Sequence, residues 1–304
     1  MRLALEHVRR MRGGAQAHLM RCDDGAYYIV KFQNNPQDLR VLANEMLVTR
    51  LGARLGLAVP QVEVIDVRPE LIANTPELSI QLGLGSTPCA AGKQFGSQFP
   101  GHPARMAIYD FLPDEQLPGV RNLPDFLGVL VLDKWTCNTN GRQAIFFREP
   151  DERAGTFGSG AAGSAGTASA QDQAPGHSMA EKTTGYTAGY SAMMIDFGFC
   201  FNAGEWDFPD APLRGLYARH AVYRRVGGID SFEPWLARLQ NRITERVLGE
   251  EAAQIPPEWY AGEWGALEGL LERLYRRRER VPELILSARD SGREPFPNWK
   301  VKYA

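Results

Sequence analysis

The chain has 304 residues, of which 44% are hydrophobic and 23% are charged, the usual balance of a soluble globular protein with one large domain or two lobes. Its formal net charge of −2 gives no field that would steer nucleic acid or an anionic membrane surface, and its four scattered cysteines argue against a zinc site or a disulfide framework. Because it shows no signal-peptide pattern and no apolar run of about 18 residues, we expect a cytoplasmic protein without a membrane segment.

The first segment that could have a functional as well as a structural role is a pair of glycines, Gly13 and Gly14, just before an expected strand. Such a pair is usually a turn, but its backbone N–H groups can also approach a phosphate because no Cβ intrudes. The segment 25–33, GAYYIVKFQ, is rich in aromatic and β-branched residues and predicts a strand. Lys31 on this strand is either a surface residue or a point charge for nucleotide phosphates.

The segment 38–57 predicts a helix, because leucines and alanines recur every four residues along it. Gly56 is a plausible stop signal for this helix. Glu45 lies about opposite the centre of the apolar stripe. The periodicity therefore leaves two alternatives open, a solvated Glu45 or one that faces a cleft and pairs with Lys31.

Further strands are expected over 59–67 and 105–113, the second ending at Pro113. Two apolar runs then flank a polar stretch that contains Asp133, Asn138 and Asn140. The simplest interpretation of this stretch is a loop between two strands, whose Asn and Asp side chains satisfy backbone groups in Asx-turns.

The segment 154–190 consists mainly of Gly, Ala, Ser and Thr and predicts a flexible insertion. It separates the strand-like run QAIFF from SAMMIDFGF, so we expect these two runs to be neighbours joined by a lengthened hairpin tip. Asp196 follows the second run, where a carboxylate could hold Mg²⁺ or cap a turn.

Beyond about residue 215 the pattern is helical, including 231–248 and 264–286. The arginines of LYRRRER, 274–280, are interpreted as a solvated helix face. Strands in the first third and helices in the last predict an α+β protein with two unlike lobes.

The order of a Gly pair, a strand Lys, a helix Glu, an Asp with an Asn five residues later, and IDFGF resembles the protein-kinase-like fold. More narrowly, GGAQAHL, NEMLVTRLGARLGLAVP, DKWTCNTNGRQAIF and MIDFGFCFN resemble the HipA-like kinase family, distant relatives of the phosphatidylinositol kinases. This resemblance implies a nucleotide-binding lobe over 1–111, and a helical catalytic lobe over 112–304 that carries the insertion.

The resemblance also implies ATP and Mg²⁺ as cofactors and assigns roles to individual residues. Gly13, Gly14 and Lys31 would contact the phosphates, Glu45 would pair with Lys31, and Asp196 would hold Mg²⁺. The stretch IYDFLPDEQL resembles a kinase hinge, so that the backbone from Asp110 to Leu112 would bond the adenine edge.

Two registers remain for the polar loop. In the plain protein-kinase register, Asp133 is the catalytic base and Asn138 binds a second Mg²⁺. In the HipA-like register, Asn140 occupies the position of the catalytic Asp, and Gln143 is the candidate for the metal-binding Asn. We favour the second register, in which Asp133 has a structural role and an amide replaces the base, which puts catalysis in doubt.

The implied activity is Mg-ATP-dependent phosphoryl transfer to a hydroxyl, with Ser or Thr of a protein as the acceptor. One alternative is a pseudokinase that binds nucleotide as a regulatory module. Another is a protein of the toxin–antitoxin type, whose task is to occupy an antitoxin-like partner. No segment resembling a phosphorylated activation loop of the protein-kinase type follows Asp196, so such a loop is not expected.

Overall fold

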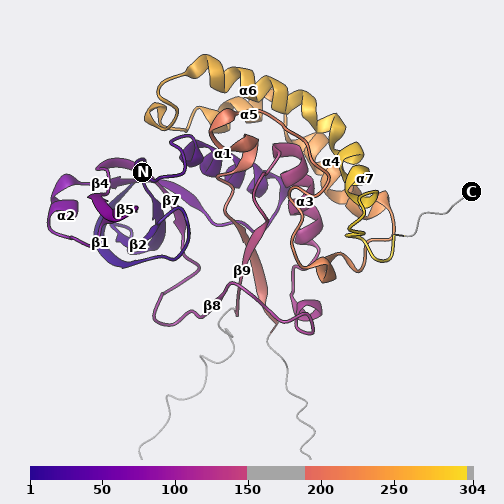
Figure 1. Ribbon diagram of the computed structural model, residues 1–304, viewed down its shortest axis with the longest axis horizontal. Coiled ribbons are helices and arrows are strands. Elements are labelled where there is room, and N and C mark those ends of the chain that lie inside the picture. The colour runs from indigo at the N-terminus through magenta and orange to yellow at the C-terminus, as the bar shows by residue number, and fades with distance from the viewer. Residues whose placement is uncertain (149–188, 300–304) are drawn as a thin grey trace, which may run out of the picture.

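The computed structural model describes residues 1–148 and 189–299, so nearly all of the expected insertion over 154–190 lies outside the described residues. The described chain has the predicted α+β class. A strand-rich N-terminal lobe lies beside a lobe of helices, with the helix α7 (Val281–Arg289) on the side away from the N-terminal strands (Figure 1).

The N-terminal lobe is built on a closed sheet in the order β1-β2-β3-β7-β4. Its strands are β1 (Arg2–Arg10), β2 (His18–Cys22), β3 (Tyr27–Lys31), β4 (Val62–Val67) and β7 (Gly92–Gln98). Neighbouring strands are antiparallel except β1 and β4, whose short parallel contact closes the sheet. Side chains on β3 alternate between buried and partly exposed, which is why Lys31 does not enter the interior of this sheet.

Three small elements flank this sheet. The helix α2 (Pro69–Ala73) follows β4, and the strands β5 (Ser79–Leu82) and β6 (Gly85–Pro88) form a separate hairpin.

The helix predicted over 38–57 is α1 (Val41–Leu55). It ends where predicted, because Gly56 adopts a φ of 80° and Leu57 N donates to Gly52 O at 3.1 Å. Most of α1 is buried, including the polar residues Asn44 and Glu45. The reason is that α1 packs against strands of the N-terminal lobe on one side and helices of the other lobe on the opposite side.

A second sheet, in the order β10-β9-β8, contains β8 (Ile108–Tyr109), β9 (Gln143–Phe147) and β10 (Ser191–Ile195). β9 and β10 pair antiparallel, as predicted for the two runs on either side of the insertion. The strand expected over 105–113 is reduced to the two residues of β8, which pair with β9. The chain thus leaves the first sheet at Gln98 and enters the second at Ile108.

The apolar run before the polar loop is the helix α3 (Asp125–Thr136), so the expectation of a loop between two strands is wrong. All of its residues after Asp125 are buried, and a continuous apolar run does not reveal its helical period. The remaining helices are α4 (Glu233–Arg242), α5 (Glu245–Ala252), α6 (Trp264–Arg277) and α7 (Val281–Arg289).

Short 3-10 segments complete the fold: η1 (Leu117–Gly119), η3 (Cys200–Glu205), η4 (His220–Tyr223), η5 (Ile229–Phe232), η6 (Pro257–Tyr260) and η7 (Arg278–Arg280). The largest core cluster joins α1, α3, β9 and β10 to the C-terminal helices. Among residues 1–148 and 189–299, no helix is long and apolar enough to span a membrane.

Candidate active site

The ammonium group of Lys31 lies between two carboxylates from distant parts of the chain. It forms ion pairs with Glu45 Oε1 on α1 and, at 2.8 Å, with Asp196 Oδ1 just after β10. Of the two alternatives for Glu45, the structure shows the pair with Lys31, and the Glu45 side chain is only 3% exposed. Burial by itself lowers the pKa of Lys31, but Glu45 and Asp196 outweigh it and hold the pKa above its usual value.

Asp196 is held in an unusual backbone conformation, with a φ of 66°. Left-handed backbone is uncommon outside glycine, so neighbouring contacts must stabilise it. Arg142 Nη2 donates to Asp196 O at 2.9 Å, and the next residue, Phe197, donates its N–H to Glu45 Oε2 at 3.0 Å. The carboxylate is thereby aimed at Lys31 from a fixed position.

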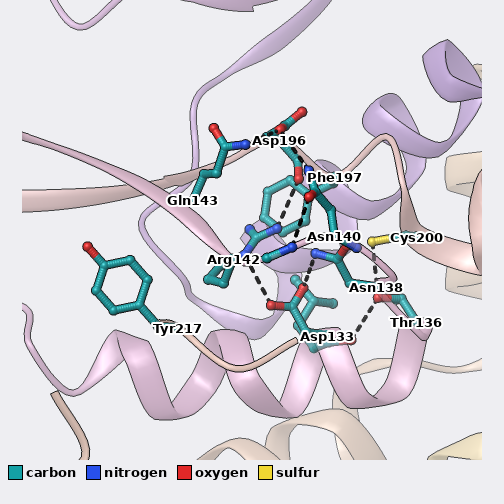
Figure 2. A network of polar contacts seen from close by, with 12 residues as sticks. Asp133, Thr136, Asn138, Asn140, Arg142, Gln143, Asp196, Phe197, Cys200 and Tyr217 are labelled. Carbon is teal, nitrogen blue, oxygen red and sulfur yellow. Dashed lines mark hydrogen bonds and ion pairs between the residues drawn. The ribbon is translucent and has the colours of Figure 1, made fainter. Parts of the chain in front are cut away.

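The second oxygen of Asp196 faces two amide side chains, as Figure 2 shows. Gln143 Nε2 donates to Asp196 Oδ2 at 2.8 Å, and Asn140 Nδ2 lies 3.5 Å from the same oxygen. Burial raises the pKa of Asp196, but the charge and hydrogen bond of Lys31 dominate and lower it below the usual value. Asp196 is therefore ionised at neutral pH.

Asp133 lies one layer deeper, on the last turn of α3 (Figure 2). Its Oδ1 accepts from Asn138 Nδ2 at 2.9 Å, and its Oδ2 lies 3.1 Å from Arg142 Nε, with both charged side chains fully buried. Burial raises the pKa of Asp133 to about 6, although Arg142 acts against this shift. An acceptor hydroxyl cannot reach a carboxylate that is fully covered and already paired.

Asn138 is also buried, and its amide is occupied at both ends. Its Nδ2 donates to Asp133, and its Oδ1 accepts from Asn140 N at 3.0 Å. Asn140 lies nearer the surface, and its Oδ1 accepts from Gly141 N at 2.9 Å. This arrangement places Asn140 and Gln143, rather than Asn138, beside Asp196.

The predicted phosphate loop connects β1 to β2 and exposes Gly13 and Gly14. Gly13 adopts a φ of 119°, which a side chain would strain. In the predicted hinge, Asp110 is exposed, whereas Leu112 is buried and its carbonyl accepts from Arg219. In the described part of the chain, no hydrogen bond or ion pair joins these four predicted residues to Lys31 or Asp196.

The sequence interpretation missed Arg142 and Asn44. Arg142 joins Asp133 to Asp196, and its guanidinium lies 4.4 Å from the centre of the Phe197 ring. Asn44 holds the segment after Asp196. Its Nδ2 donates to three carbonyls and its Oδ1 accepts from an indole N–H, the partners being Gly198, Cys200, Ala203 and Trp206. A polar pair, Asn44 beside Glu45, inside the otherwise apolar first half of the helix (residues 41–48) was the available signal.

Comparison with known proteins agrees with this geometry. A family model for HipA-like kinases matches residues 5–140, which confirms the resemblance over this part of the chain. A search of curated proteins found no match.

Two solved structures share the fold. The proinflammatory kinase CtkA of Helicobacter pylori is 11% identical with a TM-score of 0.52, and the similarity covers 94% of this chain and 96% of that one. The Golgi casein kinase is 11% identical with a TM-score of 0.50, covering 95% and 74%. At these identities the similarity establishes a protein-kinase-like fold.

Proposed function

We propose that this chain binds ATP with Mg²⁺ at the site formed by Lys31, Glu45 and Asp196, and that it transfers the γ-phosphoryl group to a hydroxyl of a protein Ser or Thr. The observation that carries the proposal is the position of Lys31 between Glu45 and Asp196. Three groups that are 14 to 165 residues apart in sequence meet at one point. A structural ion pair needs one carboxylate, whereas a phosphate site with a metal needs a lysine and a separate carboxylate.

The side chains around Asp196 fit a magnesium ion. Mg²⁺ is usually bound through one or two carboxylates together with substrate phosphates and water. Asp196 supplies one carboxylate; the amide nitrogens of Gln143 and Asn140 face its Oδ2, so each amide would have to turn to offer its neutral oxygen to the ion. Residues 1–148 and 189–299 contain no group of three His, Cys, Asp or Glu residues that could hold a metal alone, so nucleotide oxygens would complete the coordination. When bound, the ion would neutralise phosphate charge.

The residues of this chain would then bind and orient the nucleotide. Lys31 would contribute a point charge to its phosphates, and Glu45 would hold the ammonium in place. The backbone of Gly13 and Gly14 would approach the phosphates from the N-terminal lobe. We retain the hinge backbone between Asp110 and Leu112 as the proposed adenine contact.

The transfer step lacks an evident base. Asn140 occupies the position beside Asp196, and a neutral amide cannot remove a proton from the acceptor hydroxyl. Because phosphoryl transfer depends mainly on positioning and electrostatic stabilisation, the loss of a base slows the reaction without necessarily abolishing it. Asn140 therefore also favours a second candidate function, a pseudokinase that binds nucleotide without turnover.

The test is Mg²⁺-dependent ATP binding and autophosphorylation of the purified chain, with Asp196→Ala and Asn140→Asp alongside. Binding that is lost in Asp196→Ala, together with transfer by the wild type, supports the kinase. Binding without transfer, with transfer gained in Asn140→Asp, supports the pseudokinase. If the wild type binds no nucleotide, both proposals are overturned.

A further inference from the structure

A small cavity outside the proposed active site is lined almost entirely by arginine. Its volume is 250 Å³, and its lining residues are Phe208, Arg273, Arg276, Arg277 and Arg280. No acidic side chain is among them. The four arginines follow the spacing i, i+3, i+4, i+7 from α6 into η7, which places them on one face. We call this cavity the arginine pocket.

The arginine pocket corrects the interpretation of LYRRRER as a solvated face. Arg277 and Arg278 are buried. Arg278 turns away from the pocket and donates to Ile243 O at 2.7 Å. Arg277 forms the base of the pocket, with its guanidinium 4.7 Å from the centre of the Phe208 ring and paired with Asp210.

The outer arginines keep unused hydrogen-bond donors. Arg276 has only a 3.8 Å contact with the exposed Glu272, and Arg280 lies 3.4 Å from Asp210 and 3.9 Å from the exposed Glu283. These distances are too long for hydrogen bonds or marginal for them. Each guanidinium has five N–H donors, so most donors of Arg276 and Arg280 are free for a ligand.

Like charges at this spacing destabilise a helix unless an anion compensates them. Asp210 is already engaged by Arg277, the most buried of the four, whereas Glu272 and Glu283 are 70% and 77% exposed and lie 3.8 and 3.9 Å from the outer arginines. The volume of 250 Å³ is that of roughly eight liquid water molecules, which is enough for a compact tetrahedral anion with its first waters. Guanidinium groups bind phosphate oxygens in pairs and lose little entropy when they do so.

We propose that the arginine pocket binds a phosphate group, either as free phosphate or on a phosphorylated side chain of a partner protein. The site is independent of the proposed nucleotide site. It adjoins the end of α3, because Arg277 also donates to Trp135 O at 2.8 Å and to Lys134 O at 3.1 Å.

The test is calorimetric titration of the full chain with inorganic phosphate and with O-phosphoserine at constant ionic strength. Arg276→Gln and Arg280→Gln, singly and together, remove exposed side chains, so folding should be retained. Arg246→Gln is the matched control, because Arg246 and Arg276 are 81% and 78% exposed and each is paired with a Glu one turn away. Lys31→Met removes phosphate binding at the nucleotide site.

We expect the double variant Arg276→Gln/Arg280→Gln to bind phosphate and O-phosphoserine at least about tenfold more weakly than the wild type. Arg246→Gln and Lys31→Met should each bind at least one of these two ligands with the affinity of the wild type. Binding of phosphoserine as well as phosphate identifies a phosphorylated side chain as a ligand, and binding of phosphate alone identifies the free anion. The proposal is overturned if the wild type binds neither, if acetate binds equally well, or if Arg246→Gln weakens binding as much as Arg276→Gln.

Discussion

Arg142 connects Asp133 to Asp196: its Nε lies 3.1 Å from the Asp133 carboxylate, and its Nη2 donates to the backbone carbonyl of Asp196 at 2.9 Å. The charged ends of Arg142 and Asp133 are completely buried. The end of α3 is thereby joined to the residue proposed to hold the metal. Arg142 is a positioning residue in this arrangement, since it touches the backbone of Asp196 and the ring of Phe197 rather than the reacting groups.

Replacing Arg142 with Met should lower the free energy of unfolding by about 3–5 kcal/mol, because it leaves the buried Asp133 carboxylate without its charge partner. The double variant Asp133→Asn/Arg142→Met removes both charges and should recover part of this loss. Chemical denaturation measures both quantities. An effect of Arg142→Met below about 1 kcal/mol, or no recovery in the double variant, would contradict the assignment.

Replacing Asn140 with Asp should make stability depend on Mg²⁺. The new carboxylate would lie close to Asp196 Oδ2, which is 3.5 Å from Asn140 Nδ2 in this structure. Two carboxylates at this distance repel, so one of them binds a proton or the protein loses stability. Without metal, the melting temperature of Asn140→Asp should be below that of the wild type, and Mg²⁺ should raise it more than it raises the wild type.

Asn140→Ala is the control for this experiment, because it removes the amide without adding charge. It should respond to Mg²⁺ no more strongly than the wild type. Equal responses of Asn140→Asp and Asn140→Ala would argue against a metal site at Asp196. If Asn140→Asp also gains phosphoryl transfer, general-base catalysis accounts for an increase of about 10² to 10⁴.

Replacing Asn44 should release the segment after Asp196. Asn44→Ala leaves the carbonyls of Gly198, Cys200 and Ala203 without their donor, at a cost of about 1–3 kcal/mol for each that stays buried and unpaired. Asn44→Asp has the same shape but places carboxylate oxygens against carbonyls. It should destabilise at least as much as Asn44→Ala, although it keeps the acceptor for the Trp206 indole.

Hydrogen exchange of residues 198–206 provides the local measurement. In both variants the amides of this segment should exchange faster than they do in the wild type. The amides of β9, which form no hydrogen bond with Asn44, should exchange at the wild-type rate. Three consecutive residues of the segment, Phe201, Asn202 and Ala203, have a φ of 57°. Such backbone persists only when surrounding contacts determine it. Unchanged exchange in Asn44→Ala would show that other contacts hold the segment.

The sequence predicted the parts of the site that follow from local pattern and order. Lys31 lies on a strand with clear alternation, α1 ends at Gly56, and Asp196 follows a strand that pairs with β9. These features depend on short segments and their succession, which a single sequence contains.

The remaining features depend on burial from more than one side. Hydrophobic periodicity describes a helix with one buried face, but α1 is buried by both lobes. The periodicity therefore could not show that Glu45 is buried and paired, or that Asn44 is buried. The run ending at Asp133 is apolar throughout, and its helical structure follows from tertiary packing. The burial of Arg142 depends on a charge partner nine residues away, Asp133, which local pattern does not encode.

The N-terminal lobe should lose stability in acid because of His18. Its side chain is fully buried, with Nδ1 3.0 Å from His7 Nε2, and burial lowers the pKa of His18 to about 4. The folded state therefore binds fewer protons than the unfolded state between pH 4 and about 6.5. The stabilisation is complete above pH 6.5 and is lost as pH falls toward 4, by about 3 kcal/mol in total.

Asp133 has the opposite sign, because its pKa is raised to about 6 in the folded protein. Asp133 contributes stability below pH 4 that is lost as pH rises through 6. Both His18 and Asp133 therefore contribute to the pH dependence of the unfolding free energy of the wild type. Comparison with a His18→Leu variant separates them: the loss of unfolding free energy between pH 6.5 and pH 4 should be smaller in the variant by about 3 kcal/mol. His102→Gln, which removes an exposed imidazole that contacts Tyr27, is the control for the loss of a histidine as such. Equal slopes for His18→Leu and the wild type would show that His18 is not protonated on unfolding.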